Sequence, residues 1–258
     1  MKTFRPLFLF AGLLLVIGLA CSTGGGGNPT QPPQQQPTEA PVSAPTEPEP
    51  TAAPATEPPV PQSQQFFTEE FDSALSSDWD IFTVTDSAKA DPDKVTVEAK
   101  DGKLVWNFDS EYVYYYLFYN AYQYDDVRVD VRADNRGRNN NNISLICRYD
   151  PNVGWYEFNI ANSGLYDIYY AGVTKSGKIS YTQITNGGSN SIKQGKEVNE
   201  YAISCKGQEL TLFINGDQVN SITEKKYGLR EGQIGVSVSS FNVLPILIEM
   251  DWVKISQP

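Results

Sequence analysis

The sequence contains no histidine among its 258 residues, and it has only three cysteines. The absence of histidine excludes Ser-His-Asp and Cys-His nucleophiles, imidazole metal sites and the most common general base. Positive charge is also scarce, because 20 Lys and Arg face 31 Asp and Glu and the net charge is −11. No basic run occurs, so we expect no binding to nucleic acid and no basic patch for anionic lipids.

A hydrophobic run long enough to cross a membrane is missing as well. The apolar stretch from Leu7 to Ala20 has fourteen residues, which as a helix reach about 21 Å and fall short of a bilayer core of about 30 Å. Lys2 and Arg5 precede it, and small residues end it. This arrangement predicts a signal peptide over residues 1–20.

Cys21 directly follows the predicted signal peptide. This position resembles the lipobox of bacterial lipoproteins, which implies cleavage before Cys21 and a diacylglycerol on its sulfur. We therefore expect an extracytoplasmic protein that is anchored in the membrane by lipid at the cell surface. The alternative is plain secretion, with a chance cysteine at the cleavage site.

Residues 21–64 are predicted to form a disordered linker. Twelve of the chain's seventeen prolines lie here, with no aromatic residue and only four charges, all glutamate. Such a segment cannot bury enough apolar surface to offset its conformational entropy. Residues 65–258 then remain as one domain of ordinary size.

Residues 65–258 alternate between apolar and polar positions in many short stretches, and no stretch shows a helical stripe with caps. Asn215-Gly216 lies between two such stretches and is a strong signal for a type I′ hairpin turn. The pattern predicts an all-β domain, a two-sheet antiparallel β-sandwich or barrel. The clearest alternating stretches are 127–131, 143–147, 156–160, 201–205, 210–214, 234–238 and 246–250.

The order of several segments carries a family resemblance. The chain reads FTEEFDS and DGKLVW, then GWYEFNIANSGLYDI, NEYAISCKGQELTLFINGDQV, LREGQIGVSVSS and finally IEMDWVKI. It resembles the concanavalin A-like lectin and glucanase superfamily, in particular laminin-G-like jelly rolls and the 3-keto-disaccharide hydrolase domain. The resemblance implies two curved sheets with a concave face that often holds saccharide or a partner.

Catalysis would require carboxyl groups on one face of a strand. Glucanases of this superfamily carry Glu-x-Asp-x-x-Glu, and the nearest match is Glu249-x-Asp251, with Lys254 in place of the third carboxylate. The broken motif favours binding over catalysis, although other carboxylate pairs stay open. We therefore leave enzyme activity uncertain, leaning towards none.

One mixed polar and aromatic face is a candidate saccharide site. Arg148, Trp155, Glu157 and Asn159 share one phase of alternation, and Tyr169 could join them. A ring for stacking and forked donors and acceptors suit sugar hydroxyls. The alternative is a solvated outer face. The segment EYVYYYLFYNAYQYDD, with seven tyrosines, is expected to lie mostly in the core, with some rings at a groove.

The two remaining cysteines, Cys147 and Cys205, lie on apolar phases of their strands. Export favours oxidation and the number is even, so we expect a disulfide between neighbouring strands or facing sheets. The alternative is two buried free thiols.

Calcium is the one cofactor that the resemblance implies. In related jelly rolls the first and last strands run side by side, and a structural Ca²⁺ often joins them. Here Glu70 or Asp72 would face Asp251, and Ca²⁺ takes oxygen ligands without histidine. The alternative is that Asp72 caps a turn and Asp251 ends a strand in solvent.

The sequence thus predicts a surface-anchored lipoprotein with a carbohydrate-binding β-sandwich. Its partner would be a carbohydrate or another cell-surface molecule. The alternatives are a glycoside hydrolase or lyase of the same fold, and a protein-interaction or adhesion module without a sugar site.

Overall fold

A computed structural model describes residues 64–258 of the chain. The predicted signal peptide, the lipidation of Cys21 and nearly all of the predicted linker lie outside the described residues. Within residues 64–258 the chain forms fifteen strands and one short 3-10 helix, Pro92–Lys94. No helix in this part is long and apolar enough to span a membrane.

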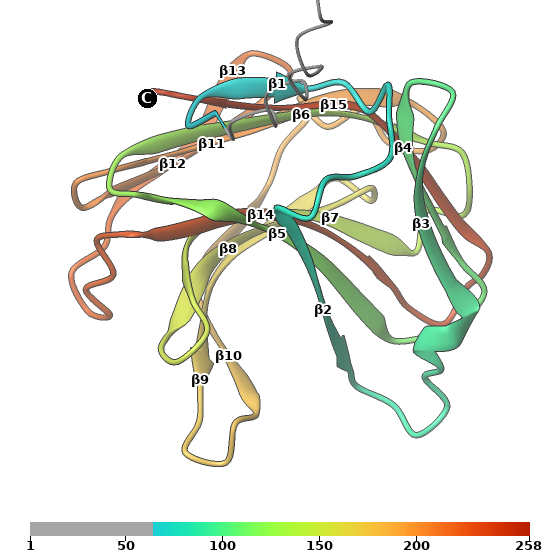
Figure 1. The fold of residues 1–258 in the computed structure, drawn as a ribbon, viewed down its shortest axis with the longest axis horizontal. Coiled ribbons are helices and arrows are strands. Elements are labelled where there is room, and N and C mark those ends of the chain that lie inside the picture. The colour runs from blue at the N-terminus through green and yellow to red at the C-terminus, as the bar shows by residue number, and fades with distance from the viewer. Residues whose placement is uncertain (1–63) are drawn as a thin grey trace, which may run out of the picture. The chain divides into compact units, whose positions relative to one another are not determined.

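Two antiparallel sheets pack face to face, as predicted for a β-sandwich (Figure 1). We call the first the back sheet. Its central strand β15 lies between β6 and β4, and the short β1 also pairs with β15. In order across the sheet, its strands are β13 (Asp217–Thr223), β12 (Glu209–Ile214), β11 (Val198–Lys206), β6 (Val127–Asn135), β15 (Ile246–Ser256), β4 (Lys103–Phe108) and β3 (Val95–Lys100), with β1 (Phe67–Glu69) beside β15.

The second sheet, called the groove sheet, curves so strongly that both of its flanks project to the same side. Figure 1 shows β2 descending on one flank and β9 and β10 on the other. The concave face therefore opens away from the back sheet. In order across the sheet, its strands are β10 (Ile179–Gly188), β9 (Leu165–Val173), β8 (Gly154–Ala161), β7 (Asn141–Asp150), β14 (Gly232–Ser240), β5 (Val113–Tyr124) and β2 (Trp79–Thr85).

The main core fills the space between the sheets. It consists of the inward phase of nearly every strand, including Trp106, Leu145, Phe158 and Val236, all with no more than 1% exposed area. Burial of this apolar surface is the dominant stabilising contribution to the fold. The predicted Asn215-Gly216 turn joins β12 to β13, and both residues have positive φ angles of 51° and 89°.

The predicted disulfide is confirmed. Cys147 of β7 and Cys205 of β11 are bonded, with their Cα atoms 6.6 Å apart. Because β7 belongs to the groove sheet and β11 to the back sheet, the bond joins the two layers through the core. Of the two arrangements that the sequence left open, the facing sheets are correct.

The tyrosine-rich strand β5 serves both faces of the groove sheet. Val113, Leu117 and Tyr119 point into the main core, whereas Tyr116 and Phe118 belong to a second, smaller cluster on the concave face. Strict alternation ends near Tyr119, where the pairing with β14 shifts register. Most rings of the segment therefore pack in or against the main core, and Tyr114, Tyr116 and Phe118 lie on the concave face.

Candidate functional site

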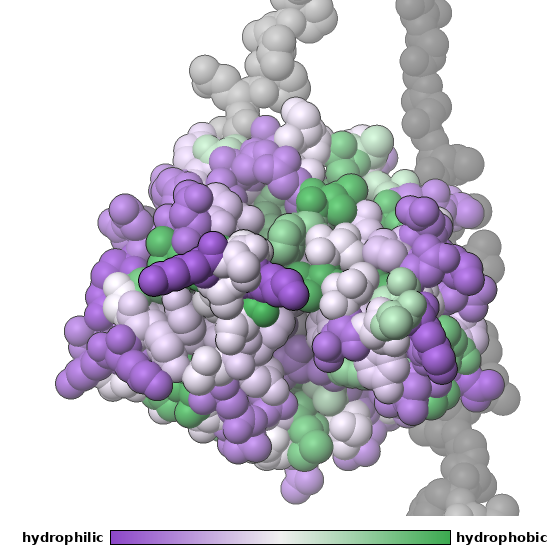
Figure 2. Space-filling view, turned by 90° about the horizontal axis from the view of Figure 1, so that it is seen from below, coloured by the Kyte–Doolittle hydropathy of each residue, from purple (hydrophilic) through white to green (hydrophobic). Residues whose placement is uncertain are grey.

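The concave face of the groove sheet carries a layer of aromatic rings. Its centre is Trp155, which makes edge contacts with Tyr116, Phe118 and Phe82 at centroid distances of 5.6 to 6.2 Å. Phe118 also stacks on Tyr149 at 3.6 Å. Seen from below, this side of the molecule is hollowed, with apolar surface between polar rims (Figure 2). We call this concave face the groove.

A cavity of about 350 Å³ lies at one end of the groove. Its volume falls within the range of ordinary small-ligand sites, about 300 to 1,000 Å³. Tyrosine rings, amides and two carboxyl groups form its walls. The lining residues are Val84, Thr85, Asp86, Tyr114, Asn142, Glu157, Asn159, Tyr169, Ile179, Tyr181 and Phe241.

Glu157 of β8 is held on the cavity wall by hydrogen bonds to both of its oxygens. Trp155 Nε1 donates to Oε2 at 3.0 Å, and Tyr116 OH donates to the same oxygen at 3.1 Å. Ser144 Oγ donates to Oε1 at 2.9 Å, with Asn159 Nδ2 at 3.5 Å. Because four donors surround one carboxyl group, its position is fixed before any ligand arrives.

Burial raises the pKa of Glu157 above that of an ordinary carboxyl group, although the four hydrogen bonds oppose this shift. Desolvation disfavours the charged form, and here that effect is the larger one. A protonated Glu157 can donate to the hydroxyl of Tyr116 or Ser144, which accept as well as donate. The cavity therefore holds a carboxyl group that gains and loses its proton at a higher pH than usual.

Three tyrosines surround this carboxyl group on the cavity side. The hydroxyl groups of Tyr116 and Tyr181 are 2.7 Å apart, which links Glu157 to a ring that lines the cavity. Burial raises the pKa of Tyr181, and it raises the pKa of Tyr169 to about 12. Both rings therefore stay neutral at physiological pH and offer hydroxyl groups as donors. Tyr114 stacks beside Tyr181 at 6.4 Å.

Of the residues predicted for the sugar site, Glu157, Asn159 and Tyr169 line one cavity. Trp155 belongs to the same face but is completely buried beneath the other rings, so its main contacts are with protein. It positions Glu157 through its indole N–H.

Arg148 does not share that face, which corrects the prediction. A bulge shifts the pairing of β7 with β8 after Cys147, and Arg148 adopts a positive φ of 57°. Its buried guanidinium donates to the carbonyl oxygens of Leu229 at 2.9 Å and Asp125 at 3.1 Å. Simple alternation along β7 could not have shown this reversal of side.

Glu249 and Asp251 do share one face, but it is the outer face of the back sheet, away from the groove. Lys103 Nζ lies 2.9 Å from Glu249 and 3.2 Å from Asp251, and Arg132 Nε donates to Asp251 at 2.7 Å. Partial burial would raise the pKa of Asp251, but hydrogen bonds from Arg132 and Lys103 lower it below the usual value. These carboxylates form a surface ion-pair network.

The predicted calcium ligands can be placed as well. The first and last strands do run side by side, with Glu69 opposite Val253. Glu70 and Asp72 follow β1, whereas Asp251 is engaged by Arg132 and Lys103. Within residues 64–258, no group of three or more acidic or cysteine side chains is arranged to hold a metal ion. Calcium binding stays a prediction.

Among the cavity residues that sequence reasoning missed are Asp86, Asn142, Tyr181 and Phe241, and it also missed Ser144, which holds Glu157 from behind the wall. Ser144 and Asn142 follow the same alternation as the predicted face and could have been added. Asp86 and Phe241 lie just beyond strand ends, so only the folded arrangement brings them here.

A family model described as the 3-keto-alpha-glucoside-1,2-lyase-like domain matches residues 67–245. The chain therefore belongs to this family of domains. Among curated proteins, no relative matches.

Solved structures share the fold, a glucanase among them. LamAcat from Zobellia galactanivorans is 10% identical with a TM-score of 0.52, covering 76% of this chain and 98% of its own. A lichenase from a mouse hindgut metagenome is 12% identical with a TM-score of 0.54, covering 76% and 100%. A LamA variant from Z. galactanivorans, in complex with laminaritriose and laminaritetraose, is 11% identical with a TM-score of 0.51, covering 74% and 98%. At these identities the likeness establishes a concanavalin A-like sandwich.

Proposed function

We propose that the groove binds carbohydrate, and that the domain is displayed outside the cell on a lipid anchor at Cys21. The observation that carries the binding function is the cavity itself. Neutral tyrosine hydroxyl groups and side-chain amides converge there beside an aromatic layer. Sugars present flat apolar faces together with hydroxyl groups, and such a surface matches both.

The hydrogen-bond network around Glu157 supports binding in particular. Asn142 Nδ2 donates to Asn159 Oδ1, and Asn159 Nδ2 donates to Ser144 Oγ at 3.1 Å. The polar groups of the wall are therefore oriented by one another, and a ligand meets a preorganised surface. Preorganisation lowers the entropic cost of binding. The oligosaccharides named for the LamA complex indicate neutral glucans as the first ligands to test.

The test is a glycan array with the purified full chain, followed by calorimetric titration of the best ligand. Tyr169→Ala removes a ring from the cavity and is expected to weaken affinity about tenfold, equivalent to about 1.4 kcal/mol. Its control is Tyr170→Ala, since Tyr170 lies on the opposite face of β9 and stacks on Tyr227 at 4.0 Å. Equal effects of the two substitutions, or no glycan bound at all, would refute the proposal.

Lyase chemistry is the second candidate, and the raised pKa of Glu157 favours it. In elimination from a 3-keto-α-glucoside, a base removes the proton at C2, which the ketone acidifies; the electron pair forms a C1=C2 double bond as the C1–O bond breaks, and the leaving oxygen takes a proton. A carboxylate with a raised pKa is a better base near neutral pH. Tyr181 lines the same cavity, and its hydroxyl group is positioned to donate the proton to the leaving group.

Glu157→Gln separates the two functions. If the site only binds, p-nitrophenyl 3-keto-α-glucoside is not cleaved by the wild type. If the site is a lyase, wild type releases p-nitrophenol, and Glu157→Gln abolishes the release while affinity for the substrate persists. Asp86→Asn is the companion variant, because it tests the second acid of the cavity without disturbing the hydrogen bonds of Glu157.

A further inference from the structure

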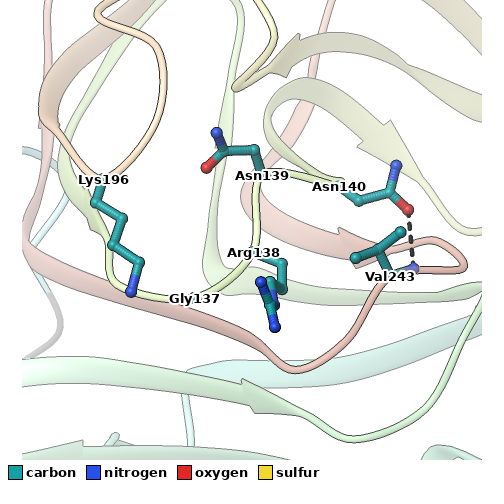
Figure 3. Close-up of a pocket in the computed structure, with 6 residues that line it drawn as sticks. All are labelled: Gly137, Arg138, Asn139, Asn140, Lys196 and Val243. Carbon is teal, nitrogen blue, oxygen red and sulfur yellow. Dashed lines mark hydrogen bonds between the residues drawn. The ribbon is translucent and has the colours of Figure 1, made fainter.

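A second pocket lies at one end of the sandwich, outside the groove. It has a volume of about 470 Å³ and is formed by the loop after β6, by Lys196 before β11 and by Val243 between β14 and β15. Figure 3 shows Lys196 and Arg138 on either side of Gly137. We call it the basic pocket, lined by Gly137, Arg138, Asn139, Asn140, Lys196 and Val243.

The charge of this pocket is opposite to that of the domain. Residues 64–258 carry a net charge of about −9, from the sequence. Arg138 and Lys196 are both exposed, and neither has an ion pair with any residue in 64–258. The neighbouring Arg136 differs, because Asp134 lies 3.2 Å from its guanidinium. Two cations in an acidic domain are therefore left without a counter-charge.

The two amides of the pocket are oriented as donors. Asn139 Oδ1 accepts from Asn135 Nδ2 at 2.8 Å, and Asn140 Oδ1 accepts from the backbone N–H of Val243 at 3.1 Å. Each amide oxygen is thus occupied, which fixes which end of the amide is the nitrogen. Neither Nδ2 has an acceptor among the residues that the structure describes. Ammonium, guanidinium and two amide N–H₂ groups together form a donor set for an anion.

The loop that carries these groups is held rigidly. The backbone N–H groups of Arg136 and Gly137 donate to Leu247 O at 2.9 and 3.0 Å, and Arg138 N donates to Pro245 O at 3.0 Å. A Cβ atom at Gly137 would lie only 2.3 Å from Leu247 N. This close approach requires glycine, and it presents Arg138 and Asn139 from a fixed backbone.

The basic pocket and the groove cavity lie on either side of one short loop. Phe241 lines the groove cavity and Val243, two residues later, lines the basic pocket. Likewise, Asn140 lines the basic pocket and Asn142 lines the groove cavity. The N–H of Phe241 donates to Asn140 O at 3.2 Å, which ties the two walls together. A chain molecule that fills the groove cavity can extend over this loop.

We propose that the basic pocket binds the carboxylate or sulfate group of an acidic saccharide whose neighbouring sugar units occupy the groove. This inference rests on the proposed carbohydrate binding and adds its substrate class. Arg138 and Lys196 contribute charge, while Asn139 and Asn140 contribute directed hydrogen bonds. Neutral saccharides use the groove alone, so the pocket selects for acidic ones.

The test compares the full chain with the double variant Arg138→Ala/Lys196→Ala. Calorimetry measures binding of an oligogalacturonate, a sulfated galactan oligosaccharide and a neutral β-glucan of equal length. The double variant should lose about threefold to tenfold in affinity for acidic ligands only, the range for two exposed ion pairs. The matched control, Lys100→Ala/Lys225→Ala, removes two exposed lysines that line neither pocket and should change nothing. Preference for galacturonate or for sulfate decides which anion the pocket takes.

A second measurement separates failure of the pocket from failure of the groove. Sodium sulfate and sodium glucuronate are titrated into the full chain, and NMR follows the Gly137 amide and the side-chain amides of Asn139 and Asn140. Shifts that vanish in the double variant support the pocket, even where no glycan binds and the groove proposal fails. Absence of shifts, or equal losses of affinity for neutral and acidic glycans, overturns the inference.

Discussion

Replacing both Cys147 and Cys205 by alanine should destabilise the domain by an amount that the chain length between them sets. The two residues are 58 positions apart in the sequence. In the chain-entropy model, a loop of this length removes about 14 cal/mol/K from the unfolded state, or about 4 kcal/mol at 25 °C. Because a domain of this size loses about 2 to 4 °C per kcal/mol, the melting temperature should fall by about 8 to 16 °C.

In this model the lost stability comes from the greater conformational entropy of the unfolded chain, and a second expectation follows. Without the bond the unfolded state is less compact and exposes more surface, so the urea dependence of the unfolding free energy should become steeper. The native groove should be unchanged, because the bond lies in the core between the sheets. Near-UV circular dichroism and glycan affinity measured well below the melting temperature check this point.

A single substitution provides the control for lost packing. Ile203→Val removes one methyl group from a buried core position on β11, two residues from Cys205 and on the same face, without changing either cysteine. It should lower stability by roughly 1 kcal/mol and leave the urea dependence unchanged. If the double cysteine variant melts within about 2 °C of the wild type, or if its urea dependence does not change, the entropic reasoning is refuted.

Four further predictions follow from other parts of the molecule. Because burial raises the pKa of Glu157, the native state keeps this proton to a higher pH than the unfolded chain does. The free energy of unfolding should therefore fall as pH rises from the ordinary carboxyl pKa to the raised pKa. Glu157→Gln should flatten this fall in denaturation series at several pH values, and an unchanged pH dependence contradicts the reasoning. Gly137→Ala should cost roughly 1 to 3 kcal/mol in urea titrations, because the new methyl meets Leu247 N. Calcium, if it joins Asp251 to Glu70 or Asp72, should raise the melting temperature over that in EDTA, and Asp251→Ala should abolish the rise; two superimposable curves would refute the calcium prediction and leave Asp251 to its ion pairs with Lys103 and Arg132. Labelling with radioactive palmitate should mark the full chain in a bacterial host and fail for Cys21→Ser, whereas labelling of both would place the lipid elsewhere.

Alternation at period two predicted an all-β sandwich or barrel, and the seven clearest alternating stretches all lie in strands, namely β6, β7, β8, β11, β12, β14 and β15. An extended strand between two layers must alternate its side chains, so the pattern reflects a local geometric requirement. The same logic placed Glu157 and Asn159 on one face, and both line the cavity. The disulfide was predicted from the even number of remaining cysteines and from the expected export of the protein. Only the fold could decide between neighbouring strands and facing sheets.

The errors arose where the register breaks. A bulge turns the Arg148 side chain to the other face of the sheet. The sequence does not predict this, because an arginine gives no indication that its φ is 57°. Placing Glu249 and Asp251 on one face was correct, but alternation cannot say which sheet or which side of it a strand occupies. That information comes from long-range pairing, here of β15 with β4 and β6. Sequence periodicity therefore locates a face, and only topology assigns that face to core, groove or solvent.

The basic pocket shows the same limit from the other direction. Its cations lie within RGRNNNN and GKE, which read separately as ordinary polar loops. They meet because the loop after β6 and the segment before β11 lie at the same end of adjacent antiparallel strands, and β15 supplies the carbonyl oxygens that hold the loop. The net charge of −11 and the lack of a basic run argued against nucleic acid and against a basic patch for anionic lipids. Net charge governs long-range attraction, whereas a directed set of donors governs local recognition, and the two can have opposite sign in one domain. An acidic saccharide should thus bind slowly at low salt, and moderate salt, by screening the overall repulsion, should speed its association. A rate that falls steadily with added salt would show that the pocket's own field dominates.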